Sequence, residues 1–109
     1  MDAQKDIIQV VREACGKKVL FLPHAIRQMS RVDRMITTPE VHMVIDNGEV
    51  IEDYPEDVRG HSCLVLGCGE DNRPVHVVCS PKEDYLAIIT AYLPDGEQWE
   101  DNYKKRKKI

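Results

Sequence analysis

The sequence lacks the features that mark several common classes of protein. No apolar run approaches the ~20 residues of a membrane-spanning helix, and the N-terminus lacks the basic-then-apolar layout of a signal peptide. The cysteines form no CxxC pair and the histidines no HxxxH pair, spacings that are typical of metal sites. No glycine-rich phosphate loop precedes a helix. We therefore expect a cytoplasmic protein with reduced cysteines and with no membrane segment, metal or cofactor.

What is present suits one globular domain over residues 1–109. A chain of 109 residues, 42% hydrophobic and 31% charged, can bury a core of its own. The net charge is −4, but the tail Lys104–Lys108 holds five of the 15 basic residues. The rest carries 10 basic against 19 acidic side chains, or −9. This asymmetry is typical of a protein with a basic anion-binding site on an otherwise acidic surface. It is equally typical of a protein with a basic tail that is simply solvated.

Hydrophobic spacing predicts helices first and a sheet after. Apolar residues recur at helical spacing over 2–15, with Gly16 as the C-cap, and again after the start signal Thr37-Thr38-Pro39-Glu40. Asn47-Gly48 ends that second helix with residues that accept a left-handed conformation. Strands are predicted at 19–22, 49–54, 62–68, 74–79 and 85–93. The short turns among the last four favour an antiparallel meander, and the fold class is α+β. Trp99 and Tyr103, four residues apart, predict a short C-terminal helix.

One stretch, residues 22–36, concentrates positive charge. Pro23 suits a first helical turn, and a rotation of about 100° per residue gathers four basic side chains within roughly 80°. Side chains of like charge repel one another unless an anion sits among them, and arginine binds phosphate through two parallel hydrogen bonds. The four residues are His24, Arg27, Arg31 and Arg34. They form a candidate phosphate site. Alternatively, the arginines form surface ion pairs with acidic side chains, and His24 hydrogen-bonds the backbone at the start of a helix.

Further candidates lie in the sheet and the tail. His76 stands inside a valine-rich strand, where it either points to a solvent-open face of the sheet or is buried and hydrogen-bonded. Tyr92 ends the last strand, where its phenol either donates to a bound oxyanion or packs at the rim. Lys104 and Arg106 in the basic tail would attract an RNA backbone in a salt-dependent way.

Five segments are distinctive in their order and spacing: Pro23–Met29, Arg34–Ile36, Gly48–Tyr54, Arg73–Val78 and Ile88–Tyr92. Together they resemble the bacterial domain-of-unknown-function family 4258, and the likeness covers roughly residues 19–106. The family usually reads HAxxRMxxR, whereas here Gln28 precedes Met29 and Arg34 comes two residues late. Either Arg27 or Arg31 therefore takes the arginine role, or the helix bulges near residues 32–33.

The resemblance implies a fold similar to RelE-type ribonuclease toxins, with helices followed by an antiparallel sheet. It also implies a toxin-type, metal-independent endoribonuclease (an mRNA interferase), acting on free or ribosome-bound RNA, and a small zinc-finger antitoxin as partner. In this hypothesis His24 is general base or acid, the three arginines hold phosphate, and His76 and Tyr92 supply the second proton donor. The alternative is a non-enzymatic binding module whose basic face docks an acidic protein or nucleic acid.

Overall fold

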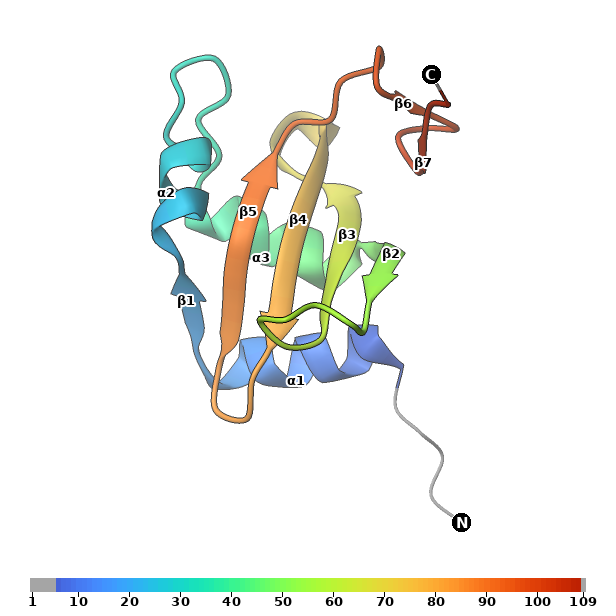
Figure 1. Ribbon diagram of the computed structural model, residues 1–109. Coiled ribbons are helices and arrows are strands. Elements are labelled where there is room, and N and C mark those ends of the chain that lie inside the picture. Colours follow the sequence, from blue (N-terminus) through green and yellow to red (C-terminus); the bar gives the residue numbers. More distant parts are fainter. Residues whose placement is uncertain (1–5, 109) are drawn as a thin grey trace.

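The computed structural model describes residues 6–108 (Figure 1). Helices and strands follow the predicted order, with helices mostly first and the sheet after. The helices are α1 (Ile7–Lys17), α2 (Pro23–Met29) and α3 (Thr38–Asn47), with a 3-10 turn, η1, at Glu70–Asn72. The strands are β1 (Val19–Phe21), β2 (Glu49–Tyr54), β3 (Ser62–Cys68), β4 (Pro74–Pro81), β5 (Leu86–Tyr92), β6 (Trp99–Glu100) and β7 (Lys105–Arg106).

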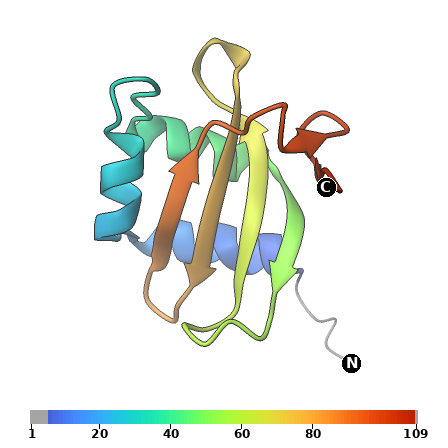
Figure 2. The ribbon, with the colours of Figure 1, turned by 45° about the horizontal axis from the view of Figure 1, so that its top comes forward.

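A five-stranded sheet forms the centre of the fold in the order β1-β5-β4-β3-β2. Strands β2 to β5 pair antiparallel, which confirms the predicted four-strand meander and the α+β class. Strand β1 adds to the β5 edge in parallel, a pairing that the sequence did not predict. Helices α1 and α3 lie against one face of the sheet, and α2 flanks the upper part of β5 beyond the end of β1 (Figures 1 and 2).

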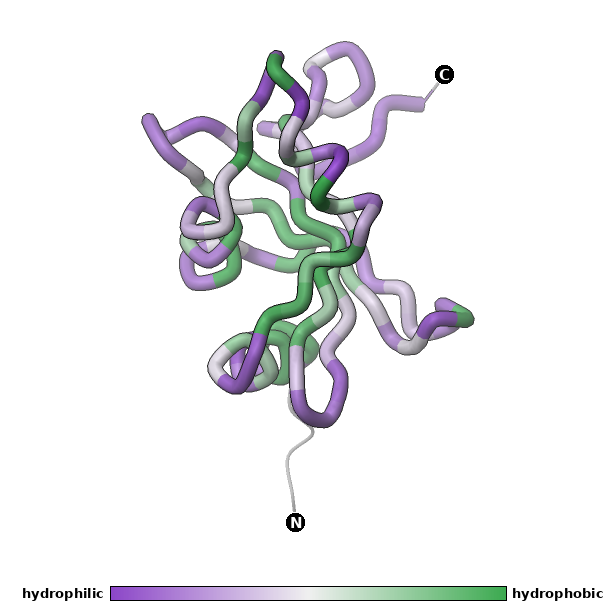
Figure 3. Tube along the Cα trace, turned by 90° about the vertical axis from the view of Figure 1, so that its left-hand side faces the viewer, coloured by the Kyte–Doolittle hydropathy of each residue, from purple (hydrophilic) through white to green (hydrophobic). Residues whose placement is uncertain are grey.

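The hydrophobic core fills the space between α1, α3 and the sheet. Alternate strand residues such as Val65, Val77 and Ile88 are fully buried there, against Val11 of α1 and Val44 of α3. Hydrophobic segments run through the middle of the molecule and hydrophilic ones through the loops (Figure 3). The remaining strand residues point to the other side, which we call the open face because neither α1 nor α3 covers it.

Two β-bulges decide which side chains reach the open face. Between Val50 and Glu52 the register shifts by one residue, so Glu49 (opposite Leu66) and Glu52 (opposite Leu64) share that face although they are three apart. A second shift makes Ile89 the extra residue of β5. Simple alternation would put residues 88 and 92 on one face; the bulge instead sends Ile88 to the core and Tyr92 to the open face.

The predicted helix over 22–36 is wrong in its second half. Helix α2 ends at Met29, and the chain then turns, with the N–H groups of Arg34 and Met35 both donating to the carbonyl of Arg31. Tertiary contacts impose this end: the Ile36 N–H donates back to the Met29 carbonyl, and Ile36 is buried. Met35 takes a left-handed backbone with φ 47°. The basic residues of this stretch therefore do not share one helical face.

The predicted C-terminal helix is also wrong. Residues 99–106 form a small antiparallel hairpin, β6 with β7, in which Trp99 pairs with Arg106. Asp101, Asn102 and Tyr103 at its turn have φ of 54°, 56° and 70°, a left-handed conformation that no right-handed helix tolerates. Burial of Trp99 against the open face stabilises the hairpin over the helix that local spacing favours.

Helix ends differ in detail from the sequence prediction. Residues 2–5 of the first predicted helix lie outside the described residues, and Gly16 is inside α1, whose C-cap is Lys18. The start of α3 is as predicted, with the Thr37 hydroxyl accepting from the Glu40 N–H. Gly48 ends α3 in an extended conformation, not a left-handed one. Glycine is needed there for space, because a Cβ would lie 2.4 Å from the Val44 carbonyl oxygen.

Candidate functional site

His76 is the centre of a polar cluster on the open face. It is 0% exposed, and its Nε2 lies 2.8 Å from the Tyr103 carbonyl oxygen. Because a carbonyl only accepts, Nε2 carries the proton and Nδ1 presents a lone pair. The Tyr92 hydroxyl, 3.2 Å from Nδ1, donates to it from the directly opposite position on β5. Both nitrogens of the buried imidazole are thus hydrogen-bonded.

The C-terminal hairpin brings an arginine to this cluster. The Trp99 indole packs edge-on against the His76 ring at 4.4 Å between centroids, and the Arg106 guanidinium lies 4.7 Å above the Trp99 ring. Arg106 also binds both carboxylate oxygens of Glu52 on β2, at 2.9 and 3.1 Å. Tyr54 donates its hydroxyl to the same carboxylate. We call Glu52, Tyr54, His76, Tyr92, Trp99 and Arg106 the open-face cluster.

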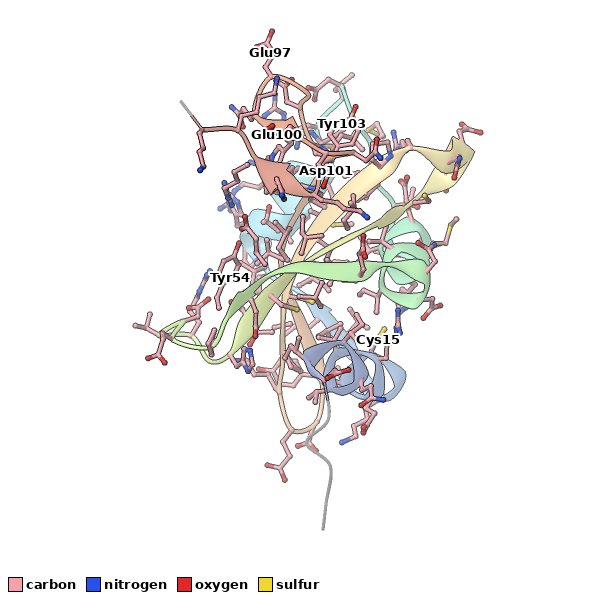
Figure 4. All side chains as sticks on the ribbon, turned by 90° about the vertical axis from the view of Figure 1, so that its right-hand side faces the viewer. Cys15, Tyr54, Glu97, Glu100, Asp101 and Tyr103 are labelled. Atoms are coloured by element: carbon pink, nitrogen blue, oxygen red, sulfur yellow. The ribbon has the colours of Figure 1, made fainter. Side chains whose placement is uncertain are left out.

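The position of the cluster is visible in side view. Tyr54 lies on the side of the sheet away from Cys15 of α1, and the hairpin turn with Asp101 and Tyr103 projects above it (Figure 4). The cluster is therefore separated from the helices by the sheet itself.

Ionisation within the cluster follows from burial and these contacts. Burial lowers the pKa of His76, against the opposing effects of the Tyr103 carbonyl and the Glu52 charge. Burial alone would raise the pKa of Glu52, but hydrogen bonds from Arg106 and Tyr54 outweigh it, and the pKa is lowered. Burial and the bond to Glu52 raise the pKa of Tyr54 to about 12. Burial also raises the pKa of Tyr92. At neutral pH the cluster holds one carboxylate, one guanidinium, a neutral imidazole and two phenols.

These groups have complementary chemical abilities. The guanidinium suits a phosphate through paired N–H donors, the carboxylate accepts protons, and the Tyr92–His76 pair connects a phenol proton to an imidazole lone pair. Among residues 6–108 there is no group of three or more His, Cys, Asp or Glu side chains placed to hold a metal ion.

The basic residues of 23–36, which we call the cation segment, lie apart from these contacts. Within the described residues, His24 and Arg27 make no hydrogen bond, ion pair or ring contact, and both are exposed. Arg31 pairs with Asp33 at 3.3 Å, and Arg34 bonds Gln28 at 3.4 Å. The structure thus brings together His76, Tyr92 and Arg106 among the predicted site residues, and it does not join His24 or the three arginines to that group. Arg31 and Arg34 are linked to each other through Asp33, whose carboxylate also lies 3.9 Å from Arg34.

The tail residues divide in a similar way. Lys104 forms an ion pair with Glu49 at 2.9 Å beside the cluster, whereas Arg106 belongs to the cluster itself. Sequence reasoning missed Glu52, Tyr54 and Trp99. A signal for the first two was available, since a carboxylate and a phenol two apart on a strand share a face. Nothing in the sequence placed Trp99 against His76.

The described part of the chain contains no helix long and apolar enough to cross a membrane. The fold and the cluster define a small α+β protein with a polar site on the uncovered face of an antiparallel sheet.

Comparison with known proteins places the chain in a family. The model described as "Domain of unknown function (DUF4258)" matches residues 21–93. Because this is more than half of the chain, the protein belongs to that family. The match includes Glu52, Tyr54, His76 and Tyr92 but ends before Trp99 and Arg106. No curated protein and no solved structure matches the chain significantly.

Proposed function

We propose that this protein is a metal-independent endoribonuclease of the toxin type, that the open-face cluster is its active site, and that its fold is RelE-like. The observation that carries the proposal is the meeting of a phosphate-binding guanidinium, a carboxylate and a hydrogen-bonded phenol–imidazole pair on one face of the sheet. Cleavage of RNA through its own 2′-hydroxyl needs these three abilities: a base, a cation and an acid.

The role of Glu52 follows from its contact with Arg106. A substrate phosphate competes with the carboxylate for the guanidinium. When Arg106 turns to phosphate, Glu52 loses hydrogen bonds that lower its pKa, while the burial that raises the pKa remains. Substrate binding therefore makes Glu52 a stronger base, suited to take the proton of the 2′-hydroxyl.

The remaining steps use Arg106 and the phenol–imidazole pair. The 2′-oxygen attacks phosphorus, and the guanidinium stabilises the negative charge that develops on the phosphate oxygens. Tyr92 gives its proton to the departing 5′-oxygen, and water restores it afterwards. The bond from phosphorus to the 5′-oxygen breaks, leaving a 2′,3′-cyclic phosphate and a free 5′-hydroxyl. Before the reaction His76 accepts the hydrogen bond from Tyr92 and so positions the phenol; the hydroxyl then turns this proton from Nδ1 to the 5′-oxygen, and the bond to His76 re-forms once water has restored the proton.

The test is incubation of the purified protein with RNA in the presence of a chelator, followed by analysis of the product ends. We expect fragments with 2′,3′-cyclic phosphates, and slower growth of bacteria that express the protein without its partner. Intact RNA together with unaffected growth would refute the proposal. Ribosomes are added in a second arm, because the RNA is either free or ribosome-bound.

A second candidate is a docking surface on the cation segment for an acidic protein, in the toxin hypothesis a small zinc-finger antitoxin. The observation that favours it is the exposure of three apolar side chains in the same segment as the unpaired guanidinium of Arg27: Ile26 at 52%, Met35 at 60% and Val32 at 92%. Exposed apolar groups with adjoining unpaired charge suit a partner of opposite charge. Arg27→Glu should abolish binding of such a partner and leave RNA cleavage unchanged. Retained binding by this variant would contradict the docking role.

A further inference from the structure

A cavity adjoins the open-face cluster and is not used by the proposed chemistry. It has a volume of about 590 Å³ and lies between the ends of β2, β3 and β4 and the turn of the C-terminal hairpin. This volume is within the range of small-molecule sites. Its lining combines apolar walls, Leu66 and Pro74, with the polar residues Asn72, Asn102, Tyr103 and Lys104.

The polar groups of the cavity have unused hydrogen-bonding capacity. Among residues 6–108, the side chains of Asn72, Asn102 and Tyr103 make no hydrogen bond, and the Tyr103 ring makes no ring contact. Asn47, also at this cavity, differs because its amide already bonds the backbone of Cys68 on both sides. The cavity therefore offers two free carboxamides and a free phenol.

The charges at the cavity cancel. Lys104 pairs with Glu49, and both line the cavity. A ligand group inside it has no net charge to neutralise, which favours a neutral polar ring over an anion. Carboxamides donate and accept at once, as the edge of a nucleobase does.

Three residues that line the cavity have a left-handed backbone conformation. Asn102 and Tyr103 adopt left-handed φ values, as does Asn72 on the opposite rim at 59°. Asparagine tolerates this conformation, but a tyrosine backbone is strained in it. The Tyr103 carbonyl is held by His76, so the residue that lines the cavity also orients the imidazole. The cavity and the open-face cluster are thus parts of one surface, joined through Tyr103.

We propose that this cavity binds a nucleobase of single-stranded RNA, with the carboxamides of Asn72 and Asn102 reading its edge and Tyr103 supplying an aromatic platform. This inference rests on the proposed function, because it identifies the substrate class of the same site. Arg106 follows Tyr103 by three residues and reaches Glu52. A base in the cavity therefore places the adjoining phosphate on the side of the guanidinium.

The experiment uses short 2′-O-methyl oligonucleotides, which cannot be cleaved through the 2′-oxygen, each carrying one type of base. Binding to the full chain is followed by NMR of the Asn72 and Asn102 side-chain amides and the Tyr103 backbone amide. We expect these signals to shift, and an abasic oligonucleotide to bind about tenfold more weakly, as for loss of one stacked base. Free nucleosides should shift the same signals at higher concentration. Equal affinity for base-bearing and abasic oligonucleotides would overturn the inference.

Variants give a second readout. Tyr103→Ala should weaken binding about tenfold and Tyr103→Phe should retain it, because the ring is what stacks. Tyr85→Ala is the matched control, since Tyr85 is a half-buried tyrosine that lines a different cavity; it should bind as the unaltered protein does. Dispersed NMR spectra confirm folding of each variant. A Tyr103→Ala variant that folds and binds normally contradicts the inference.

The two proposals fail separately. Base-dependent binding of uncleavable oligonucleotides by a protein that never cuts RNA retains the nucleobase site and removes the nuclease. Cleavage that depends on Glu52, with no difference between base-bearing and abasic ligands, retains the nuclease and removes the nucleobase site.

Discussion

The open-face cluster and the cation segment hold similar chemical groups but are assembled differently. Members of the cluster come from positions 52 to 106 and meet only after five strands have packed, whereas the cation segment is a run of neighbours in the chain. In the cluster, His76 has partners at both nitrogens, and Glu52 receives hydrogen bonds from two side chains. In the cation segment His24 and Arg27 have none among the described residues.

This difference teaches that density of charge in a sequence is poor evidence for a site. Neighbouring charges on a solvated surface need no partner, because water screens them. Charges and polar groups that are brought together by folding pay a desolvation cost, and they persist only where specific partners offset it. The convergence of His76, Tyr92, Glu52 and Arg106 is therefore the more informative observation. Single substitutions can decide whether catalysis depends on the cluster or on the cation segment.

The largest effect is expected from Glu52→Gln. Glutamine keeps the size of the side chain but cannot take a proton, and loss of a general base typically lowers the rate by about 10²–10⁴-fold. RNA cleavage under single-turnover conditions measures this loss. Glu97→Gln, an exposed change in the C-terminal region, is the control and should be fully active. A Glu52→Gln variant that is folded and equally active would move the site away from the cluster.

Arg106→Ala should lower cleavage by about 10²–10³-fold, the usual cost of removing one group that stabilises transition-state charge. Lys105→Ala, one residue away and exposed, has no side-chain partner among the described residues and serves as the control. Both variants remove one positive charge, so a general loss of RNA attraction affects them alike. Equal reductions of the cleavage rate in the two variants would mean that Arg106 acts only through the general positive charge of the tail and has no catalytic role in the cluster.

The unfolding free energy should fall as the pH drops from about 7 to 5. The folded pKa of His76 is below the unfolded value of 6.5, so the unfolded state binds more protons in this window and acid favours unfolding. The slope from one such group is at most about 1.4 kcal/mol per pH unit. Urea unfolding at several pH values measures it, and the slope should be smaller in His76→Gln. Glu40 and Glu52 also have lowered pKa values, but their contributions are lost only below about 4.5.

The smallest effects are expected in the cation segment. His24→Ala and Arg27→Ala should each change the cleavage rate by no more than about twofold and the unfolding free energy by no more than ~0.5 kcal/mol. Substitution of an exposed side chain without a partner usually has effects of this size. Parallel cleavage and unfolding measurements check this. If His24→Ala instead abolishes cleavage while RNA binding persists, His24 is catalytic, and the active site lies in the cation segment and not in the open-face cluster.

Much of the fold follows from local patterns. Capping residues predict the start of α3 after Thr37, and alternating hydrophobic residues with short turns predict the four antiparallel strands. A proline predicts where β4 begins. Two predicted helices are wrong, the second half of 22–36 and the C-terminal helix. In both segments the hydrophobic spacing is helical, but tertiary contacts stabilise a different backbone more than a helix would be stabilised. Burial of Ile36 ends the first, and burial of Trp99 replaces the second.

The candidate site was predictable only in part, for a geometric reason. His76 and Tyr92 were named from the sequence, yet plain alternation in β5 would have turned Tyr92 into the core with Ile88. One extra residue, Ile89, reverses the alternation of side chains between the two faces, and nothing in the local sequence predicts this bulge. Another bulge, between Val50 and Glu52, sets Glu49 and Glu52 on the same face.

By itself, the sequence determined the class of fold, the order of its elements and the residue types from which a site could be built, because caps and hydrophobic periods act over a few residues. The tertiary structure alone decided which of those residues meet. Strand phase depends on bulges, and the position of Arg106 depends on a hairpin that packs Trp99 on His76. Such contacts link positions that are distant in the chain, and their free energy appears only when the sheet has formed.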